Sequence, residues 1–319
     1  MVVESYLKFN YSLRPSKQVE RKMLVEALLR LGLQGYAIPE YTYLGFGSVY
    51  YADFQVFHRY LYIDRMICVE GGDIPRRMEF NKPFGSINLE LGMLSDVIPT
   101  LDRNLKYLAW PDYDVPLDRS VLSDVRRLVS ILSPGSVLLV TVDAEARARF
   151  EHPLDNRTGE QIRADRVEEI NSDIGAFLDK PLTVADYDNA SLPGVFAEAL
   201  LNAVSDEVTK RGDVAFCQLF NYRYRDGAQM LSLGGILDTP ERVEGVLASP
   251  FMQWLHLSRE KEPIRISVPP LTPLERQCLD AWVTEPNQTA PLPFELTDEH
   301  LSSFARYRRY YPQYFESFT

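Results

Sequence analysis

Short apolar runs alternate with amphipathic runs between residues 41 and 142, and this alternation constrains the fold more than any other feature of the sequence. The last apolar run, VLLVTV, is continuous, as expected of a parallel strand that is buried on both faces. Strands that alternate with helices predict a parallel sheet whose ligands bind beyond the carboxyl ends of the strands. The apolar runs lie at residues 41–44, 66–69, 87–91, 105–110 and 137–142.

An antiparallel hairpin is predicted after the parallel strands. Residues 213–237 contain two runs rich in strand-forming residues, one on each side of Arg225-Asp226-Gly227. Asp-Gly is a strong signal for a tight hairpin turn. The sequence therefore predicts an α/β protein whose mostly parallel sheet acquires an antiparallel pair.

Three segments are predicted along the chain. Residues 1–35 form an N-terminal extension and a helix, with Ser16 as a plausible N-cap. Residues 36–262 form the α/β domain, in which the highly charged stretch 144–212 is expected to be a helical cover over the carboxyl edge of the sheet. Residues 263–319 begin with several prolines and form a C-terminal helical tail.

A glycine turn and an acid mark the front half of the α/β domain. Gly45 and Gly47 follow the first predicted strand and let the backbone turn sharply and approach a ligand. The second strand ends at Glu70, where folds of this type hydrogen-bond ribose hydroxyls. The full dinucleotide fingerprint is not met, because Tyr50 occupies the third glycine position. The alternative for Gly45 and Gly47 is a tight turn that binds no ligand, and the alternative for Glu70 is an exposed acid in a loop.

Composition excludes several classes of protein. The formal net charge of −11 disfavours a protein that coats nucleic acid, without excluding a local basic face. The three cysteines are far apart and the four histidines form no HExxH pattern, which argues against a disulfide framework and against zinc hydrolase chemistry. We find no signal core and no apolar stretch of membrane-spanning length, so we expect a cytoplasmic protein without a membrane partner.

Two basic segments each have two interpretations. Arg14, Lys17 and Arg21 lie along the start of the first predicted helix, either as an anion-binding strip or as a solvated face paired with Glu20 and its neighbours. Residues 306–311 interleave arginine and tyrosine. That pattern suits stacking on single-stranded nucleic acid, or an amphipathic helix that buries its aromatic stripe.

The order of these features resembles the class I S-adenosylmethionine-dependent methyltransferase superfamily. In that family the sheet has seven strands, and the last two form a hairpin that makes strand seven antiparallel. The resemblance covers about residues 36–240. The chain is also similar to a group of bacterial O-methyltransferase-like sequences, through YLGFGSVYYADF, RMEFNKPF, PDYD and SPGSVLLVTVDA. The expected fold is therefore a Rossmann-like, seven-stranded, mostly parallel sheet with a terminal antiparallel hairpin.

The resemblance also implies a cofactor, S-adenosylmethionine, and its binding residues. Gly45 and Gly47 would approach the methionine part, and Glu70 would hold the ribose hydroxyls. Met93 stands where an adenine-contacting acid is expected, and Ser95 or Asp96 could substitute for it. The chain departs from the family pattern near strand one, where Glu40 is the nearest acid.

Asp112 and Asp114, just past the fourth strand, are the predicted catalytic residues. The resemblance places Asp112 near the sulfonium methyl and the acceptor. A general base assists methyl transfer to a hydroxyl, and either aspartate could supply it. Asp112 and Asp143 could instead share Mg²⁺ or Ca²⁺, or both could be helix caps or loop acids. We predict no metal site.

The sequence thus predicts an S-adenosylmethionine-dependent methyltransferase that transfers methyl to an oxygen of an unidentified acceptor. Pro111 precedes Asp112 instead of following it, which disfavours the motif of methyltransferases that act on amino groups of bases. The main alternative is a non-catalytic Rossmann-like protein that senses a nucleotide or acts as a scaffold. A third, an NAD-dependent oxidoreductase, is disfavoured by Tyr50. Small-molecule, protein and nucleic-acid acceptors all stay open, as does a homo-oligomer.

Overall fold

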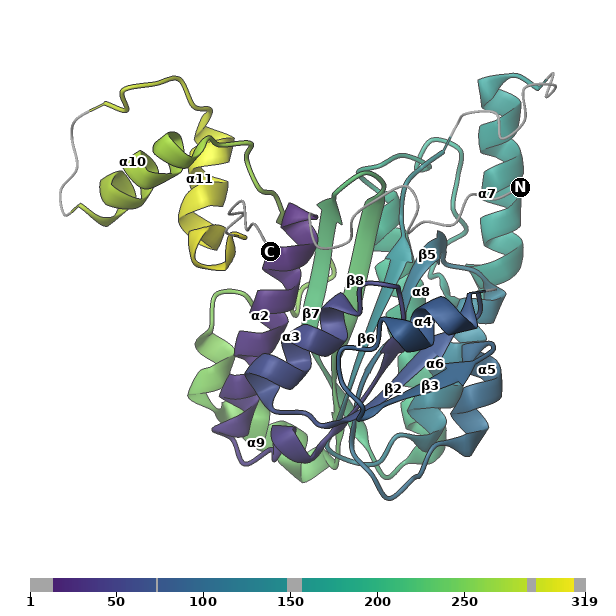
Figure 1. The fold of residues 1–319 in the computed structure, drawn as a ribbon. Coiled ribbons are helices and arrows are strands. Elements are labelled where there is room, and N and C mark those ends of the chain that lie inside the picture. The colour runs from purple at the N-terminus through teal and green to yellow at the C-terminus, as the bar shows by residue number, and fades with distance from the viewer. Residues whose placement is uncertain (1–13, 73, 148–156, 286–290, 313–319) are drawn as a thin grey trace.

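One mixed sheet forms the centre of the protein (Figure 1). The computed structural model describes residues 14–72, 74–147, 157–285 and 291–312. Within these residues the strand order is β3-β2-β1-β4-β6-β8-β7-β9, and β5 pairs with β6 beside β4. The strands are β1 (Thr42–Phe46), β2 (Arg65–Glu70), β3 (Ile87–Leu91), β4 (Tyr107–Trp110), β5 (Asp112–Pro116), β6 (Ser136–Asp143), β7 (Ala215–Arg225), β8 (Gln229–Asp238) and β9 (Ile264–Ile266).

Strand β8 is antiparallel to both of its neighbours, β6 and β7, whereas the other pairs are parallel. The hairpin between β7 and β8 turns at the predicted Asp226-Gly227, and Gly227 has a positive φ of 117°. The predicted Rossmann-like sheet with a terminal antiparallel hairpin is therefore confirmed. Strands β5 and β9 are additions to the seven that were predicted.

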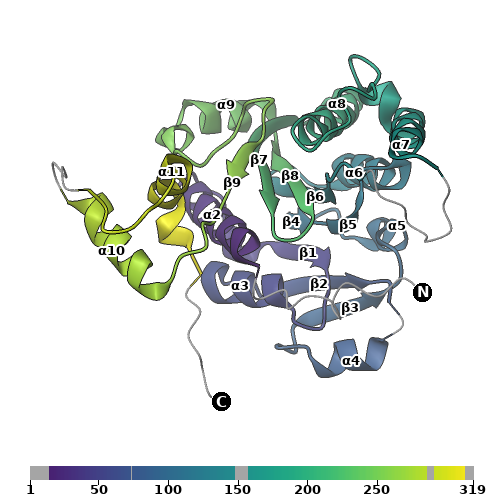
Figure 2. The same cartoon turned by 90° about the horizontal axis from the view of Figure 1, so that it is seen from above.

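Helices cover both faces of the sheet (Figure 2). One face packs against α2, α3 and α9, and the other against α5, α6, α7 and α8. The tail carries α10 and α11. The helices are α2 (Pro15–Gly32), α3 (Ala52–Leu61), α4 (Pro75–Phe80), α5 (Leu94–Val97), α6 (Arg119–Ile131), α7 (Gly159–Ile174), α8 (Leu192–Arg211), α9 (Pro240–Ala248), α10 (Pro273–Thr284) and α11 (Asp298–Tyr307). Short 3-10 helices lie at Ile38–Glu40, Ile98–Thr100, Gly175–Phe177, Pro250–Gln253 and Arg308–Tyr310.

The predicted cover contains two helices with different surroundings. Helix α8 is one of the flanking helices of the sheet, and it buries Phe196, Leu200 and Ala203 completely. Helix α7 rises beyond the carboxyl edge (Figure 1). Residues 148–156 of the predicted cover lie outside the described residues. The segment boundaries drawn from the sequence stay a prediction.

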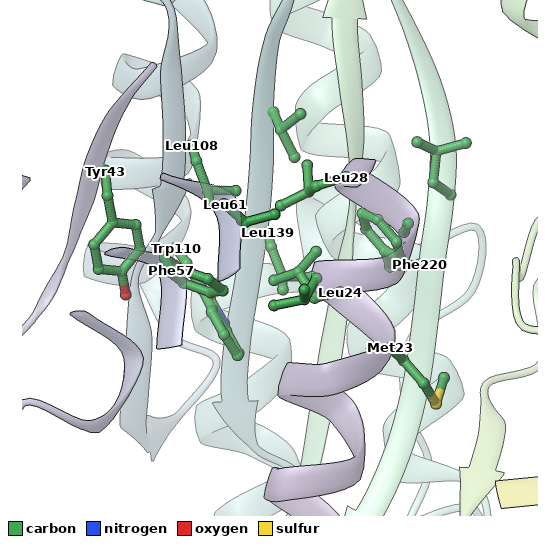
Figure 3. Packing of buried hydrophobic residues seen from close by; sticks show 14 of the residues in the cluster. Met23, Leu24, Leu28, Tyr43, Phe57, Leu61, Leu108, Trp110, Leu139 and Phe220 are labelled. Carbon is green, nitrogen blue, oxygen red and sulfur yellow. The ribbon is translucent and has the colours of Figure 1, made fainter. Parts of the chain in front are cut away.

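Helix α2 packs across the strands at the centre of the sheet. Leu24 and Leu28 of α2 point toward Leu139 of β6 (Figure 3), and Met23 and Phe220 of β7 belong to the same buried cluster. The predicted N-cap, Ser16, is wrong, because the helix begins at Pro15. The backbone N–H groups of Ser16 and of its neighbour instead donate to Asp226, at the tip of the hairpin, at 3.1 and 2.8 Å.

The end of the tail packs against α2 through aromatic side chains. Tyr307, Tyr310 and Tyr311 are buried, and the hydroxyl of Tyr310 donates to Glu26 of α2 at 2.5 Å. The arginine and tyrosine pattern of residues 306–311 is therefore a helix that buries its aromatic stripe. In the described part of the chain, no helix combines the length and the apolar character that crossing a membrane requires.

His256 lies inside this aromatic contact. Its ring stands 5.1 Å from the ring of Tyr310 and 5.2 Å from that of Trp254, both edge-on, and the side chain is buried. The pKa of His256 is lowered to about 4, chiefly by burial and also by the Arg306 cation, against the opposing charge of Glu26. The imidazole is therefore neutral in the folded protein at pH 5, but charged in the unfolded chain.

We expect acid to destabilise the fold through His256. Between pH 6.5 and 4 the unfolded state binds a proton that the native state does not, so the stabilisation is fully present above pH 6.5 and is lost as the pH falls toward 4. The loss between pH 7 and pH 5 is about 2 kcal/mol. Urea unfolding at the two pH values should show that His256→Phe removes this difference, whereas His300→Gln, on the surface of α11, keeps it. An unchanged pH dependence in His256→Phe would contradict the assignment.

Candidate functional site

The carboxyl ends of β1, β2, β3 and β4 lie at one edge of the sheet. Gly45 of β1 is in register with Cys68 of β2 and with Trp110 of β4. Glu70, at the end of β2, is in register with Leu91 of β3. The topology therefore brings the predicted residues of the first, second, third and fourth strands to the same edge.

Gly47 lies directly against the second strand. Its N–H donates to the carbonyl of Val69 at 3.0 Å. A Cβ atom at Gly47 would collide with Sγ of Cys68, would stand 2.7 Å from Cε of Met78, and would lie 3.6 Å from Oε2 of Glu70. Any larger residue would require Cys68 and Met78 to shift, so glycine lets the backbone lie this close to the Glu70 carboxylate.

Gly45 has a different local reason. A Cβ atom there would collide with the hydroxyl end of the Tyr43 ring, two residues earlier on the same face of β1. That ring is buried, and its centroid lies 4.8 Å from those of Phe54 and Phe57 in α3, edge-on in both cases. The structure accounts for Gly45 by packing, and its role in cofactor binding stays a prediction.

The loops that follow β2 and β3 are connected through Glu70. Oε1 of Glu70 accepts from the N–H of Gly72 at 2.9 Å, and the N–H of Gly92 donates to the Glu70 carbonyl at 3.0 Å. Beside them Leu91 and Met93 are 57% and 66% exposed, which is unusual for large apolar residues next to a sheet. The structure therefore places the carboxylate of Glu70 close to an exposed apolar wall.

Met93 is the N-cap residue of α5, and the alternative Asp96 lies in the first turn of the same helix. A Cβ atom on Gly92 would lie 3.8 Å from Oδ2 of Asp96. Ser95, the other alternative, is half-buried beside them. All three predicted candidates for the adenine position thus stand at this loop, and the choice among them stays a prediction.

The segment after β4 is a further strand, which the sequence analysis did not predict. Strand β5 pairs with β6, with Asp112 opposite Thr141. Asp112 is 24% exposed at its side chain, and its Oδ2 lies 3.0 Å from Nζ of Lys17 in α2. Asp114 is exposed. Asp112 therefore stands at the edge in contact with the protein interior, whereas Asp114 faces outward.

A buried cluster of charges lies beneath Asp112. The predicted pairing of Lys17 with Glu20 is observed, but the pair is buried and not part of a solvated face. Lys17 is only 2% exposed, and its Nζ lies 3.0 Å from Oε2 of Glu20, which is also buried. Arg21 is buried as well and pairs with Asp53 of α3 at 2.5 Å. These cations are neither a solvated face nor an open anion-binding strip, because carboxylates of the same chain neutralise them.

The pKa shifts in this cluster follow from burial and from the pairing. Burial alone would lower the pKa of Lys17, but the charges of Asp112 and Glu20 reverse that shift and raise it. Burial raises the pKa of Glu20, against the opposing effect of Lys17. The sequence places Lys17 and Glu20 three residues apart on a helix, which signals a contact between them, but it gives no sign that both are buried.

A cavity of about 220 Å³ lies farther along the same edge, under α7. Its lining combines apolar side chains such as Leu117 and Phe196 with charged ones. Asp143, at the end of β6, borders it and pairs with Arg147, and its Oδ1 accepts from the N–H of Glu145 at 2.9 Å. Burial raises the pKa of Asp143, against the effects of that N–H and of the guanidinium.

The described residues contain no cluster of three or more His, Cys, Asp or Glu side chains that is arranged to hold a metal ion, at this edge or elsewhere. Asp112 and Asp143 are the two carboxylates that could share Mg²⁺ or Ca²⁺ on the sequence alone. Asp112 pairs with Lys17, and Asp143 pairs with Arg147, so each has a basic partner of its own.

Residues 9–319 match the model of a family that is described as "Putative O-methyltransferase". The chain belongs to this family. The membership confirms the prediction of a methyltransferase. The mostly parallel sheet with its antiparallel hairpin is the fold that the resemblance implied. The NAD-dependent oxidoreductase was already disfavoured by Tyr50 and has no support in this assignment.

Solved structures of low identity are also similar to this chain. Trm1 from Pyrococcus horikoshii, solved with S-adenosylmethionine, is 13% identical, with 77% of this chain and 61% of that chain covered and a TM-score of 0.46. The O-methyltransferase TomG from Streptomyces achromogenes is 14% identical, with 74% and 92% covered and a TM-score of 0.35. An O-methyltransferase from Bacillus cereus is 14% identical, with 66% and 79% covered and a TM-score of 0.34. No curated protein matches the sequence.

We expect Gly47→Ala to destabilise the protein by about 1–3 kcal/mol, because the new methyl group must displace Cys68 or Met78. Gly71→Ala is the matched control on the neighbouring loop, where the nearest atoms would stand at 3.7 Å. It should change the free energy of unfolding by no more than about 0.5 kcal/mol. Urea denaturation of the two variants checks this, and equal stabilities would show that Gly47 is not sterically required.

Proposed function

We propose that the protein transfers a methyl group from S-adenosylmethionine to a hydroxyl of a small-molecule acceptor. The observation that carries the cofactor assignment is the carboxylate of Glu70, which stands at the end of β2 beside Gly47 of β1. Exposed Leu91 and Met93 add an apolar wall at the adjacent strand end. A carboxylate suits ribose hydroxyls, and an apolar wall suits a purine, so the residues present fit this cofactor.

In this proposal each residue of the edge has one task. Glu70 holds the ribose hydroxyls, and Met93 contacts the adenine. Gly47 lets the backbone approach the methionine part. The bound cofactor supplies the electrophilic methyl, so the protein has only to align the acceptor with it, to exclude water and to take up a proton.

Asp112 is the proposed general base. The acceptor oxygen forms a bond to the methyl carbon as the carbon–sulfur bond breaks, and the electron pair of that bond stays on sulfur. The hydroxyl proton passes to the carboxylate of Asp112, which faces the edge with 24% of its side chain exposed. Asp114 is the alternative base, and its exposed side chain makes it the second choice.

The cavity beneath α7 supports a small acceptor. Its volume of about 220 Å³ suits a molecule of modest size, and its floor is apolar at Leu117, Leu192 and Phe196. The net charge of −11 argues in the same direction, against a polyanionic acceptor. We also propose that the protein acts in the cytoplasm, where S-adenosylmethionine and small hydroxylated metabolites are both present.

A regulatory protein that binds the cofactor without turning it over is the second candidate. Two features favour it. Tyr43 fills the first strand where an acid is expected, and Asp112 already pairs with Lys17. Such a protein would bind S-adenosylhomocysteine normally and would methylate nothing.

The ribose assignment predicts that Glu70→Gln weakens binding of S-adenosylhomocysteine by about 10- to 100-fold, because a charge-assisted hydrogen bond to the hydroxyls is lost. Glu90→Gln, on the adjacent strand β3, is the matched control, since its carboxylate accepts instead from Asn88 at 2.6 Å. Isothermal titration calorimetry measures both. Unchanged affinity in Glu70→Gln would refute the assignment, and no binding by the wild type would refute the proposed cofactor.

The proposed reaction predicts that the wild type transfers the labelled methyl group of S-adenosylmethionine to the small-molecule fraction of a cell extract. The protein and nucleic-acid fractions should stay unlabelled. Asp112→Asn should keep the affinity for S-adenosylhomocysteine and should lose about 100-fold or more in transfer, the usual contribution of a general base. Label in a macromolecular fraction would contradict the acceptor class. Binding without any transfer would favour the regulatory protein.

A further inference from the structure

We infer that Lys17 is a positioning residue, which fixes the carboxylate of Asp112 at the carboxyl edge of the sheet. Helix α2 precedes the first strand of the sheet. The positioning of Asp112 by Lys17 would therefore give this N-terminal helix a role in the site. The inference rests on the proposed function, in which Asp112 faces the sulfonium and the acceptor. The contacts of Lys17, the anchoring of α2 and the unequal burial of two carboxylates support it.

The ammonium of Lys17 is held by two ion pairs and one hydrogen bond. Nζ lies 3.0 Å from Oε2 of Glu20 and 3.0 Å from Oδ2 of Asp112, and it donates to the hydroxyl of Tyr224 in β7 at 3.1 Å. It also stands 4.2 Å from the centre of the Trp110 ring. Because these contacts come from different elements, they fix the position of the ammonium. A carboxylate that pairs with it is therefore paired with a fixed charge.

The backbone that carries Lys17 is fixed as well. The carboxylate of Asp226, at the tip of the β7–β8 hairpin, accepts the N–H groups of Ser16 and Lys17 at 3.1 and 2.8 Å. One turn later, Arg21 forms hydrogen bonds to both oxygens of Asp53 in α3, at 2.5 and 3.3 Å. The first turns of α2 are thus attached to the hairpin on one side and to α3 on the other.

The two carboxylates that share Lys17 differ in burial. Glu20 is completely buried, whereas 24% of the Asp112 side chain is exposed at the edge. Glu20 therefore neutralises the lysine inside the protein, and Asp112 is the one that a ligand can reach. Removal of Lys17 leaves Asp112 free to turn toward water, while removal of the Glu20 charge leaves the Lys17–Asp112 contact in place.

The experiment compares S-adenosylhomocysteine with sinefungin, in which an amine-bearing carbon replaces the sulfonium. Calorimetry measures the affinity of each ligand, and the ratio of the two affinities reports how well a carboxylate is placed for the positive charge. Lys17→Met alone would strand the buried Glu20 charge, so Lys17→Met is combined with Glu20→Gln, an exchange of a buried pair for neutral groups of similar size that proteins tolerate. Glu20→Gln alone is the matched control.

We expect the wild type and Glu20→Gln to prefer sinefungin by about tenfold or more, and the Lys17→Met/Glu20→Gln variant to lose that preference while it keeps its affinity for S-adenosylhomocysteine. In an Asp112→Asn background, which lacks the preference already, the two further substitutions should change nothing. This double-mutant cycle separates positioning of Asp112 from a general effect of Lys17 on the fold.

Each other outcome decides against the inference. A preference that survives Lys17→Met/Glu20→Gln, or that increases, would show that Lys17 does not place Asp112. A wild type that binds S-adenosylhomocysteine without preferring sinefungin would remove Asp112 from the sulfonium and overturn the inference while the proposed cofactor stands. A wild type that binds neither ligand would overturn the proposed function as well.

Discussion

The site depends on the need to neutralise charges that have been taken out of water. Lys17, Glu20 and Arg21 lie on α2 at the centre of a packed interface, where an unpaired charge would cost several kcal/mol. Glu20 and Lys17 pair within α2, whereas Asp112 comes from β5 and Asp53 from α3. Because the pairs of Lys17 with Asp112 and of Arg21 with Asp53 form only when α2, α3 and β5 are together, the cluster favours one arrangement of these elements.

The sheet supplies the other half of the geometry. Parallel strands end at a common edge, so Glu70, Gly92 and Asp112 come to the same edge although they are apart in sequence. The hairpin of β7 and β8 reaches the same edge from the other end of the sheet, and its Asp226 holds the start of α2. The methyltransferase sheet and the helix that precedes it thus form one structure at the point where ligands are expected.

Much of the fold could be predicted because its signals are local. The run at residues 137–142 indicates a strand buried on both faces, and Asp226-Gly227 indicates the hairpin, and both are observed. Strand β5 escaped prediction because Pro111 and two aspartates are typical of a loop, and only the register with Thr141 makes the segment a strand. The three-residue β9 is too short to give a periodic signal.

The site was predictable to the extent that it lies at strand ends. Glu70 and Asp112 were found from their positions after β2 and β4, and the structure places both at the edge. The role of Lys17 could not be read, because a lysine at the start of an amphipathic helix is usually solvated. Its burial is decided by Tyr224 and Asp112, which no local pattern connects to it.

The bond between Asp226 and the start of α2 joins residues 210 positions apart. A contact of such separation requires the chain to close a long loop before it adds any stability. The residues of the first helix are synthesised long before those of the hairpin that holds its N-terminus. The parallel strands alone do not complete this edge of the sheet. It is complete only when the hairpin of β7 and β8 has been synthesised and packs against α2.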